Sequence, residues 1–175
     1  MKSYRMKYKF DPQKFRLGMR TLKTGLAVFL VLLLFTLFHW KGLQIGALTA
    51  VFSLREDFGK SISFGMSRVL GNTIGGILSL VFYLINAILP NQIWVTLIFV
   101  PILTMLTIML NVSFNNKSGV IGAVAALLII TLSIPSSHTF MYALSRIFET
   151  FCGVFIAIIV NTDLEIIIQK VKGKN

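Results

Sequence analysis

Two apolar segments of this chain each carry an arginine, and the residues around the two arginines follow the same pattern. Ser67 precedes Arg68 and Ser145 precedes Arg146, and in both segments a glycine follows the arginine by seven positions. An isolated guanidinium at the centre of a bilayer costs about 2.5 to 3.5 kcal/mol on insertion scales. Either the arginines extend to the headgroups from duplicated packing helices, or they form a paired cationic site for an anion that crosses the membrane.

Polar side chains that could assist the arginines lie one helical turn further along. Asn72 and Thr150 each follow their arginine by four positions, on the same face of a helix. Glu149 follows Arg146 by three positions, where its carboxylate could form a structural salt bridge or couple anion movement to protons. The predicted anion pathway consists of Arg68, Arg146, Glu149, Asn72, Thr150 and Thr49.

Glycines accompany both arginine segments. Gly71, Gly75, Gly76 and Gly153 would let neighbouring helices approach closely, and this packing role is favoured over a direct role in the pathway.

The composition excludes several classes of protein. The chain is 55% hydrophobic, with a mean hydropathy of +0.81, which 175 residues could not bury in a soluble core. Its 17 Lys and Arg against 6 Asp and Glu cluster beside apolar spans, so they indicate membrane topology rather than nucleic-acid binding. We find no metal-ligand cluster, nucleotide-binding loop or hydrolase motif, and therefore predict a protein that is not an enzyme and needs no metal or cofactor.

The apolar runs predict an all-α membrane protein with six transmembrane helices and cytoplasmic N- and C-termini. A basic interfacial arm (1–23) precedes a transmembrane domain (24–161) and a short basic tail (162–175). The second span is the shortest and could be a half-helix. Basic residues concentrate in the arm, the tail and alternate loops, as the positive-inside rule requires of a multi-pass plasma-membrane protein. The expected spans are 24–38, 42–54, 62–85, 93–110, 118–132 and 139–160.

The two halves of the chain resemble each other. The arginine segments are offset by 78 residues, and Gly46-Ala47-Leu48-Thr49-Ala50 resembles Gly122-Ala123-Val124-Ala125-Ala126 at an offset of 76. Because each half would contain three spans, the halves must have opposite orientations in the membrane. The pattern predicts inverted-topology repeats over about 24–86 and 92–161, as in many transporters.

Several of these motifs together resemble the aromatic acid exporter superfamily, which includes the fusaric acid resistance proteins and, more distantly, plant aluminium-activated malate channels. The motifs are Lys23-Thr24-Gly25-Leu26-Ala27, Leu48-Thr49-Ala50-Val51, Arg68 with Gly71, Asn72, Gly75 and Gly76, and Arg146 with Glu149, Thr150, Gly153, Ala157 and Asn161. The resemblance implies export or passive conduction of organic anions by proteins that often dimerise, with the arginines lining the pathway. Asn72 stands where the superfamily usually has Thr, and Glu149 where Asp is common. Many relatives carry a large cytoplasmic domain after the sixth span, where this chain has only a short tail.

We therefore expect a membrane transporter or channel for small carboxylate anions, acting in efflux. The alternative is a non-transporting membrane scaffold or a subunit of a larger membrane complex. The expected partners are a small organic anion, anionic lipid headgroups that contact the basic arm, and a second copy of the chain, with a dimer favoured. Whether the protein would act as a channel or as a coupled transporter stays open.

Overall fold

The computed structural model describes residues 17–55, 57–89, 93–133 and 139–172, excluding the side chains of 139 and 163–172. Its helices confirm the predicted all-α fold, and the described residues contain no strand. Most of the predicted basic arm lies outside these residues. The elements are α1 (Met19–Leu37), α2 (Leu43–Ser53), α3 (Phe58–Ile88), α4 (Ile93–Ser113), the short 3₁₀ helix η2 (Lys117–Gly119), α5 (Val120–Ser133) and α6 (Thr139–Lys172).

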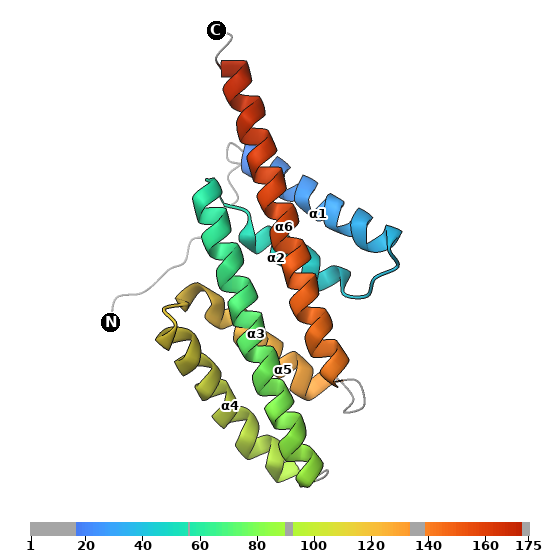
Figure 1. Cartoon of the computed structure of the whole chain (residues 1–175), viewed down its shortest axis with the longest axis vertical. Helices are drawn as coiled ribbons and strands as arrows, with labels where there is room; N and C mark the ends of the chain where they lie inside the picture. The colour runs from blue at the N-terminus through green and yellow to red at the C-terminus, as the bar shows by residue number, and fades with distance from the viewer. Residues whose placement is uncertain (1–16, 56, 90–92, 134–138, 173–175) are drawn as a thin grey trace, which may run out of the picture.

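The two longest helices, α3 and α6, pack against each other and run in opposite directions along the molecule (Figure 1). Helices α1 and α2 pack on α6 beside one half of this pair, and α4 and α5 pack on α3 beside the other half. The short helices α2 and α5 contact both long helices. Each half of the sequence therefore packs much of its apolar surface against the long helix of the other half.

Two separate apolar clusters result from this packing of each half on the long helix of the other half. The first joins α1, α2 and α6, and the second joins α3, α4 and α5. The fully buried Phe35 lies in the first cluster, and the fully buried Leu127 lies in the second. Between the clusters, the α3–α6 contact combines buried polar residues such as Asn72 and Thr150 with small and apolar residues such as Gly65, which meets Val154. The contact between the two long helices therefore includes buried hydrogen-bonding groups.

Within the described residues, four helices are long and apolar enough to cross a membrane, namely α1, α3, α4 and the Phe140–Thr162 part of α6. The shortness expected of the second span is found in α2, whose 11 residues extend about 16 Å at 1.5 Å per residue. Helix α5 was expected to be a full span, but its 14 residues extend only about 21 Å, against a hydrocarbon core of about 30 Å. The expected span began at 118, but residues 118 and 119 belong to the 3₁₀ helix η2, so α5 begins only at Val120.

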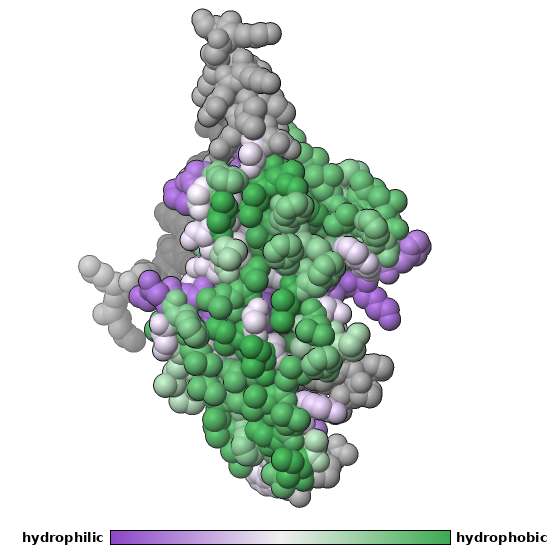
Figure 2. All heavy atoms as spheres, in the orientation of Figure 1, coloured by the Kyte–Doolittle hydropathy of each residue, from purple (hydrophilic) through white to green (hydrophobic). Residues whose placement is uncertain are grey.

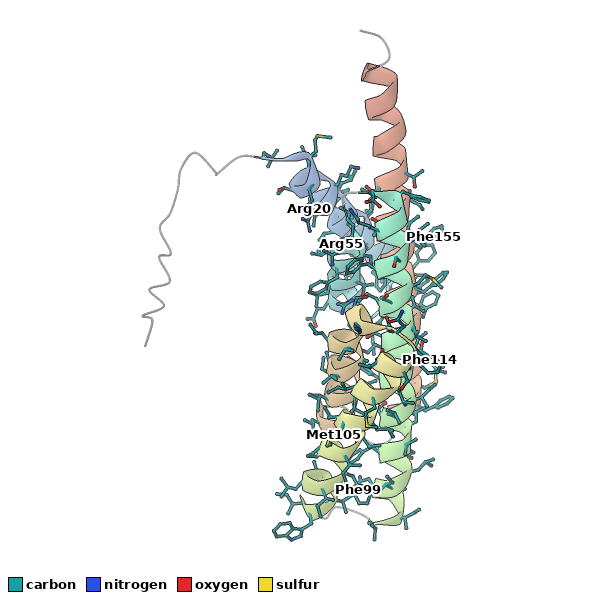
Figure 3. All side chains as sticks on the ribbon, turned by 90° about the vertical axis from the view of Figure 1, so that its left-hand side faces the viewer. Arg20, Arg55, Phe99, Met105, Phe114 and Phe155 are labelled. Carbon is teal, nitrogen blue, oxygen red and sulfur yellow. The ribbon has the colours of Figure 1, made fainter. Side chains whose placement is uncertain are left out.

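The surface is predominantly apolar, as a lipid-facing surface must be (Figure 2). Large apolar side chains such as Ile88 and Trp94 are 79% and 67% exposed. Outward-facing Met105 on α4 is a further example (Figure 3). Several polar side chains are instead fully buried, among them Asn111 and Asn161. This distribution, together with the four long apolar helices, identifies a membrane protein.

Helices α1 and α4 end in the same turn at positions 76 residues apart. His39 and Asn115 adopt the left-handed conformation, with φ of 53° and 56°. In the first turn the Trp40 amide donates to the Phe35 carbonyl at 2.9 Å, and in the second the Asn116 amide donates to the Asn111 carbonyl at 2.8 Å. Both are Schellman motifs, which satisfy the last carbonyls of a helix. The repeated turn directs the chain from a long helix into a short one in each half of the sequence.

The side chains at the two turns differ. Trp40 packs edge-on against Phe35, with ring centroids 5.6 Å apart, whereas the Asn116 amide donates to the Asn111 amide oxygen at 2.8 Å. Asn116 also donates to the backbone carbonyl of Ser67 on α3 at 3.1 Å. The same backbone geometry therefore supports an aromatic cluster in the first half of the sequence and an amide network in the second.

Candidate functional site

The centre of the α3–α6 contact is a hydrogen bond between two of the predicted pathway residues. The Asn72 amide nitrogen donates to the Thr150 hydroxyl oxygen at 2.6 Å, and the Thr150 hydroxyl donates to the Arg146 carbonyl at 2.7 Å. Asn72 and Thr150 are 78 residues apart, which is also the offset between the two arginines. Both side chains are buried, and the amide oxygen of Asn72 has no hydrogen-bond partner.

Arg68 lies beside this central contact. Its guanidinium carbon lies 4.3 Å from the ring centroid of Phe52 on α2, a cation–π contact. A β-carbon on Gly122 of α5 would lie 2.7 Å from one of its terminal nitrogens and 3.4 Å from the Asn72 amide oxygen. A side chain at position 122 would therefore displace the guanidinium from its present position. Its Nε is buried without a hydrogen-bond partner.

Arg146 is buried on α6, with only 7% of its surface exposed. The Tyr142 side chain, one turn earlier on α6, contacts the guanidinium. The Nε of Arg146 has no hydrogen-bond partner, and its charge is close enough to that of Arg68 for the two to repel. The structure therefore brings together two guanidinium groups whose buried donors are incompletely satisfied, an arrangement that an anion would stabilise.

Glu149 does not form the salt bridge with Arg146 that the sequence spacing allowed. No ion pair within 4.0 Å joins these two described side chains, although their charges attract each other. The Glu149 carboxyl group instead lies on Gly42, the residue before α2, where any β-carbon would overlap the carboxyl atoms. Gly42 has a φ of 91°, and no side-chain hydrogen bond caps α2 at this residue. The carboxyl group thus lies at a helix N-terminus, where free amides and the helix dipole favour an anion.

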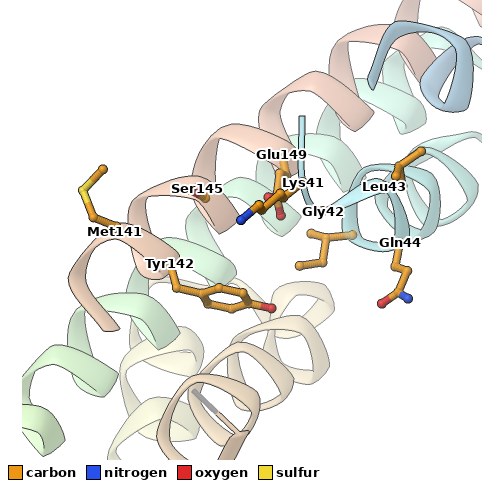
Figure 4. A pocket seen from close by; sticks show the side chains of 9 residues that line it. Lys41, Gly42, Leu43, Gln44, Met141, Tyr142, Ser145 and Glu149 are labelled. Atoms are coloured by element: carbon orange, nitrogen blue, oxygen red, sulfur yellow. The ribbon is translucent and has the colours of Figure 1, made fainter. Parts of the chain in front are cut away.

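A cavity of about 490 Å³ opens beside this helix N-terminus (Figure 4). It lies between the start of α2 and the start of α6, and Glu149, Lys41, Tyr142 and Ser145 contribute its polar groups together with Gln44. An adjoining cavity of about 300 Å³ shares Lys41, Ser145 and Glu149 and extends beneath Trp40 and Phe148. The combined site offers an ammonium, hydroxyls and aromatic walls around one carboxyl group, and neither Arg68 nor Arg146 is among its lining residues. An ionised Glu149 would oppose a bound anion, whereas the other polar groups could contact one.

Comparison with known proteins identifies the family of the chain. Residues 15–164 match the profile described as aromatic acid exporter family member 1. The chain belongs to the aromatic acid exporter family. It is also 30% identical over 149 residues to UPF0421 protein YgaE of Bacillus subtilis (strain 168). That match covers 83% of this chain but only 39% of the relative, so the chain spans well under half of the relative's length.

In this aromatic acid exporter family chain, three of the four glycines predicted to pack helices make close backbone approaches. A β-carbon on Gly71 would lie 2.5 Å from the Gly119 carbonyl oxygen, and one on Gly75 would overlap the Ala123 carbonyl oxygen. One on Gly153 would overlap the Gly46 carbonyl oxygen. Gly76 differs, because its β-carbon would make only ordinary contacts at 3.9 Å.

The remaining predicted pathway residue, Thr49, is buried on α2 against Gly153. It is 2% exposed, and no hydrogen bond or ion pair joins it to either arginine within the described chain. Thr49 therefore contributes to the α2–α6 contact rather than to the immediate surroundings of the guanidinium groups.

Sequence reasoning missed the residues of the exporter-family chain that line the main cavity beside Glu149. Neither Lys41 nor Tyr142 was among the predicted pathway residues, whereas both line this cavity. A signal for Tyr142 was present, since it precedes Arg146 by four positions on one helix face. Among the described residues, no group of three His, Cys, Asp or Glu could hold a metal ion.

Proposed function

We propose that this protein transports small carboxylate-bearing organic anions across the plasma membrane, in the direction of efflux. The observation that carries the proposal is the pair of neighbouring guanidinium groups, Arg68 and Arg146, each with a buried Nε that lacks a partner. A carboxylate can accept two parallel hydrogen bonds from one guanidinium, and the low dielectric of a membrane interior strengthens that contact. Membership of an exporter family supports transport rather than catalysis.

The pathway would lie between two halves related by inverted topology. This proposal is supported by the matching turns at His39 and Asn115 and by the Asn72–Thr150 hydrogen bond between positions one repeat apart. It is also supported by the reciprocal packing of α2 on α6 and α5 on α3. Short helices in corresponding positions of two halves are characteristic of transporter binding sites. With loop charges that follow the positive-inside rule, both termini would be cytoplasmic.

The two ends of the proposed pathway differ in the structure. At the start of α2, Glu149 borders a cavity of about 490 Å³. At the start of α5, the Gly119 backbone instead packs directly against Gly71, which is the residue one repeat before Glu149. An open site at one short helix and a closed contact at the other support alternating access, with the α2 end open. The Glu149 carboxyl group would then occupy the position that a substrate carboxylate takes.

The other partners of the protein are also proposals. The basic arm would lie on anionic headgroups, and the chain would associate with a second copy, because the family resemblance implies dimers. A subunit role in a larger membrane complex is the alternative.

The test is anion flux into liposomes that contain the purified protein, with benzoate, malate and chloride as probes. Arg68→Gln and Arg146→Gln are each expected to lower carboxylate flux at least about tenfold, because a charged hydrogen bond is worth about 1.5 to 3 kcal/mol. Lys117→Gln removes a positive charge from an exposed side chain on η2 and should leave flux unchanged.

Wild-type flux in both folded arginine variants would refute the proposed site. A wild-type protein that transports none of the probes until a second chain is added would instead favour the subunit role. Circular dichroism and melting temperature show whether each variant is folded, so a loss of flux can be separated from a loss of structure.

A further inference from the structure

We propose that a second, cationic cavity binds the phosphate of an anionic membrane lipid. The cavity has a volume of about 210 Å³ and is lined by Arg20, Arg55, Lys60 and Phe64. A cavity that holds one water molecule needs a volume of about 10 to 15 Å³, so this cavity can hold a much larger group. Arg20 comes from the first turn of α1, Arg55 from the α2–α3 loop, and Lys60 and Phe64 from the first turns of α3. Arg20 and Arg55 lie beside each other at one end of the molecule (Figure 3).

The two described acidic side chains leave the arginines of this cavity without a carboxylate partner. Asp57 forms an ion pair with Lys60 at 3.0 Å and accepts a hydrogen bond from the Lys60 backbone amide. The other acid whose side chain the structure describes, Glu149, lies at the start of α2. Among the described residues, neither Arg20 nor Arg55 has a carboxylate partner, and the buried Nε of Arg55 has no hydrogen-bond partner. An anion in the cavity would supply that partner.

A chain of hydrogen bonds holds the α2–α3 loop, which carries Arg55, to α1, α3 and α6. The Lys23 ammonium donates to the Asn161 amide oxygen at 2.9 Å, and the Asn161 amide nitrogen donates to the Ser61 hydroxyl at 3.1 Å. The Ser61 hydroxyl accepts the Arg55 backbone amide at 2.9 Å. Helices α1, α3 and α6 thereby fix the loop that carries Arg55. A site held in this way loses little conformational entropy when an anion binds.

The surroundings favour a lipid over a soluble anion. The Arg55 guanidinium lies over the Phe64 ring at 3.9 Å from its centroid, which leaves the guanidinium edge available to a phosphate. Leu22 on α1 is two residues from Arg20, and Ile62 on α3 is two residues from Lys60. Their side chains are 50% and 36% exposed, so the acyl chain of a lipid bound in the cavity could lie against them. A cationic cavity beside a lipid-facing apolar surface matches the two parts of a phospholipid.

The experiment is native mass spectrometry of the purified protein in detergent, titrated with phosphatidylglycerol, phosphatidylcholine of the same acyl chains, or soluble glycerol 3-phosphate. We expect one phosphatidylglycerol to bind at least about tenfold more tightly than phosphatidylcholine. Arg55→Gln should weaken this binding about tenfold. Arg55→Lys keeps the charge but loses the planar guanidinium, so its affinity for phosphatidylglycerol should lie between those of wild type and Arg55→Gln. Lys117→Gln, which removes an exposed charge elsewhere, should bind like wild type.

Equal binding of the two lipids would overturn the proposal, as would the same loss in Lys117→Gln as in Arg55→Gln. Glycerol 3-phosphate that binds as tightly as phosphatidylglycerol would assign the cavity to a soluble phosphate and also overturn it. If Arg55→Gln does not fold, Arg20→Gln changes the same cavity from an exposed position. Because no flux is measured, this result is independent of the proposed transport function.

Discussion

Replacing Gly75 with alanine should destabilise the protein, whereas the neighbouring change Gly76→Ala should leave its stability unchanged or raise it slightly. Gly75 faces α5, where a β-carbon would overlap the carbonyl oxygen of Ala123. Gly76 faces α6, where a β-carbon would lie 3.9 Å from Ala143 and Ile147. The two substitutions add the same methyl group to adjacent residues of one helix, so their difference isolates the α3–α5 contact.

The size of the destabilisation depends on how far α5 must move to accommodate the added methyl group. The Ala123 carbonyl belongs to the α5 backbone, so it cannot rotate away as a side chain could, and α5 must shift from α3. A gap of about 0.5 to 1 Å forfeits about a quarter to a half of the dispersion energy of each atom pair across an interface. Overpacking of this kind costs about 1 to 3 kcal/mol, while alanine gains about 1 kcal/mol over glycine within a helix. Gly75→Ala should therefore lose up to about 2 kcal/mol, while Gly76→Ala should gain up to about 1 kcal/mol. The two variants should differ by the overpacking cost, about 1 to 3 kcal/mol.

Thermal unfolding in detergent, followed by far-ultraviolet circular dichroism, measures this difference. For a chain of this size 1 kcal/mol corresponds to about 2 to 4 °C, so Gly76→Ala should melt about 2 to 12 °C above Gly75→Ala. Gly153→Ala, which meets the Gly46 carbonyl on α2, should behave like Gly75→Ala. A Gly75→Ala protein that melts at or above Gly76→Ala would show that α3 and α5 do not pack this closely.

Two further predictions concern polar contacts. Thr150→Val should lower the free energy of unfolding by about 0.5 to 1.5 kcal/mol, because the Asn72 amide loses its acceptor, whereas Thr150→Ser keeps the hydroxyl and most of the stability; equal melting temperatures for the two variants would contradict this. At the start of α3, the hydrogen bond from the Lys60 backbone amide and the Lys60 side chain lower the pKa of Asp57 below its ordinary value of 3.8. This contribution to stability is present above the unfolded pKa and is lost as pH falls through the lowered folded pKa. Asp57→Asn should therefore reduce the fall in melting temperature on acidification from about pH 5 to pH 3, and an unchanged pH slope would refute the argument.

The helices could be predicted because their signals lie in continuous apolar runs. The expected end of the first span at 38 and start of the fourth at 93 lie within one residue of the ends found for α1 and α4. The start of α5 was harder to predict. The Schellman turn at Asn115 depends on a backbone conformation that glycine usually marks, and this residue is an asparagine within a polar stretch. Without that turn, α5 could not be recognised as another short helix.

The two arginines could be found because their spacing repeats along the chain, whereas their surroundings could not. The helical spacing of Arg146 and Glu149 suggested a local ion pair. The fold instead presents the Glu149 carboxyl group to Gly42, a residue more than 100 positions away in the sequence. Lys41 joins the same cavity only because α2 packs on α6. Contacts of this kind depend on tertiary packing, which single-sequence periodicity does not encode.

The position of the Asn72–Thr150 hydrogen bond has a mechanical consequence for the proposed alternating access. It lies where α3 and α6 meet, between residues one repeat apart, so a rocking of one helix on the other about this point would change its length least. The starts of α2 and α5 lie on opposite sides of the α3–α6 pair (Figure 1). The same rocking would therefore separate Gly71 from Gly119 on one side while it closes the cavity beside Glu149 on the other. Because the apolar clusters lie at the ends and polar groups at the centre, such a motion would move each cluster as a unit. The two arginines flank the pivot, so an anion bound between them could stay in contact with guanidinium groups while access changes sides.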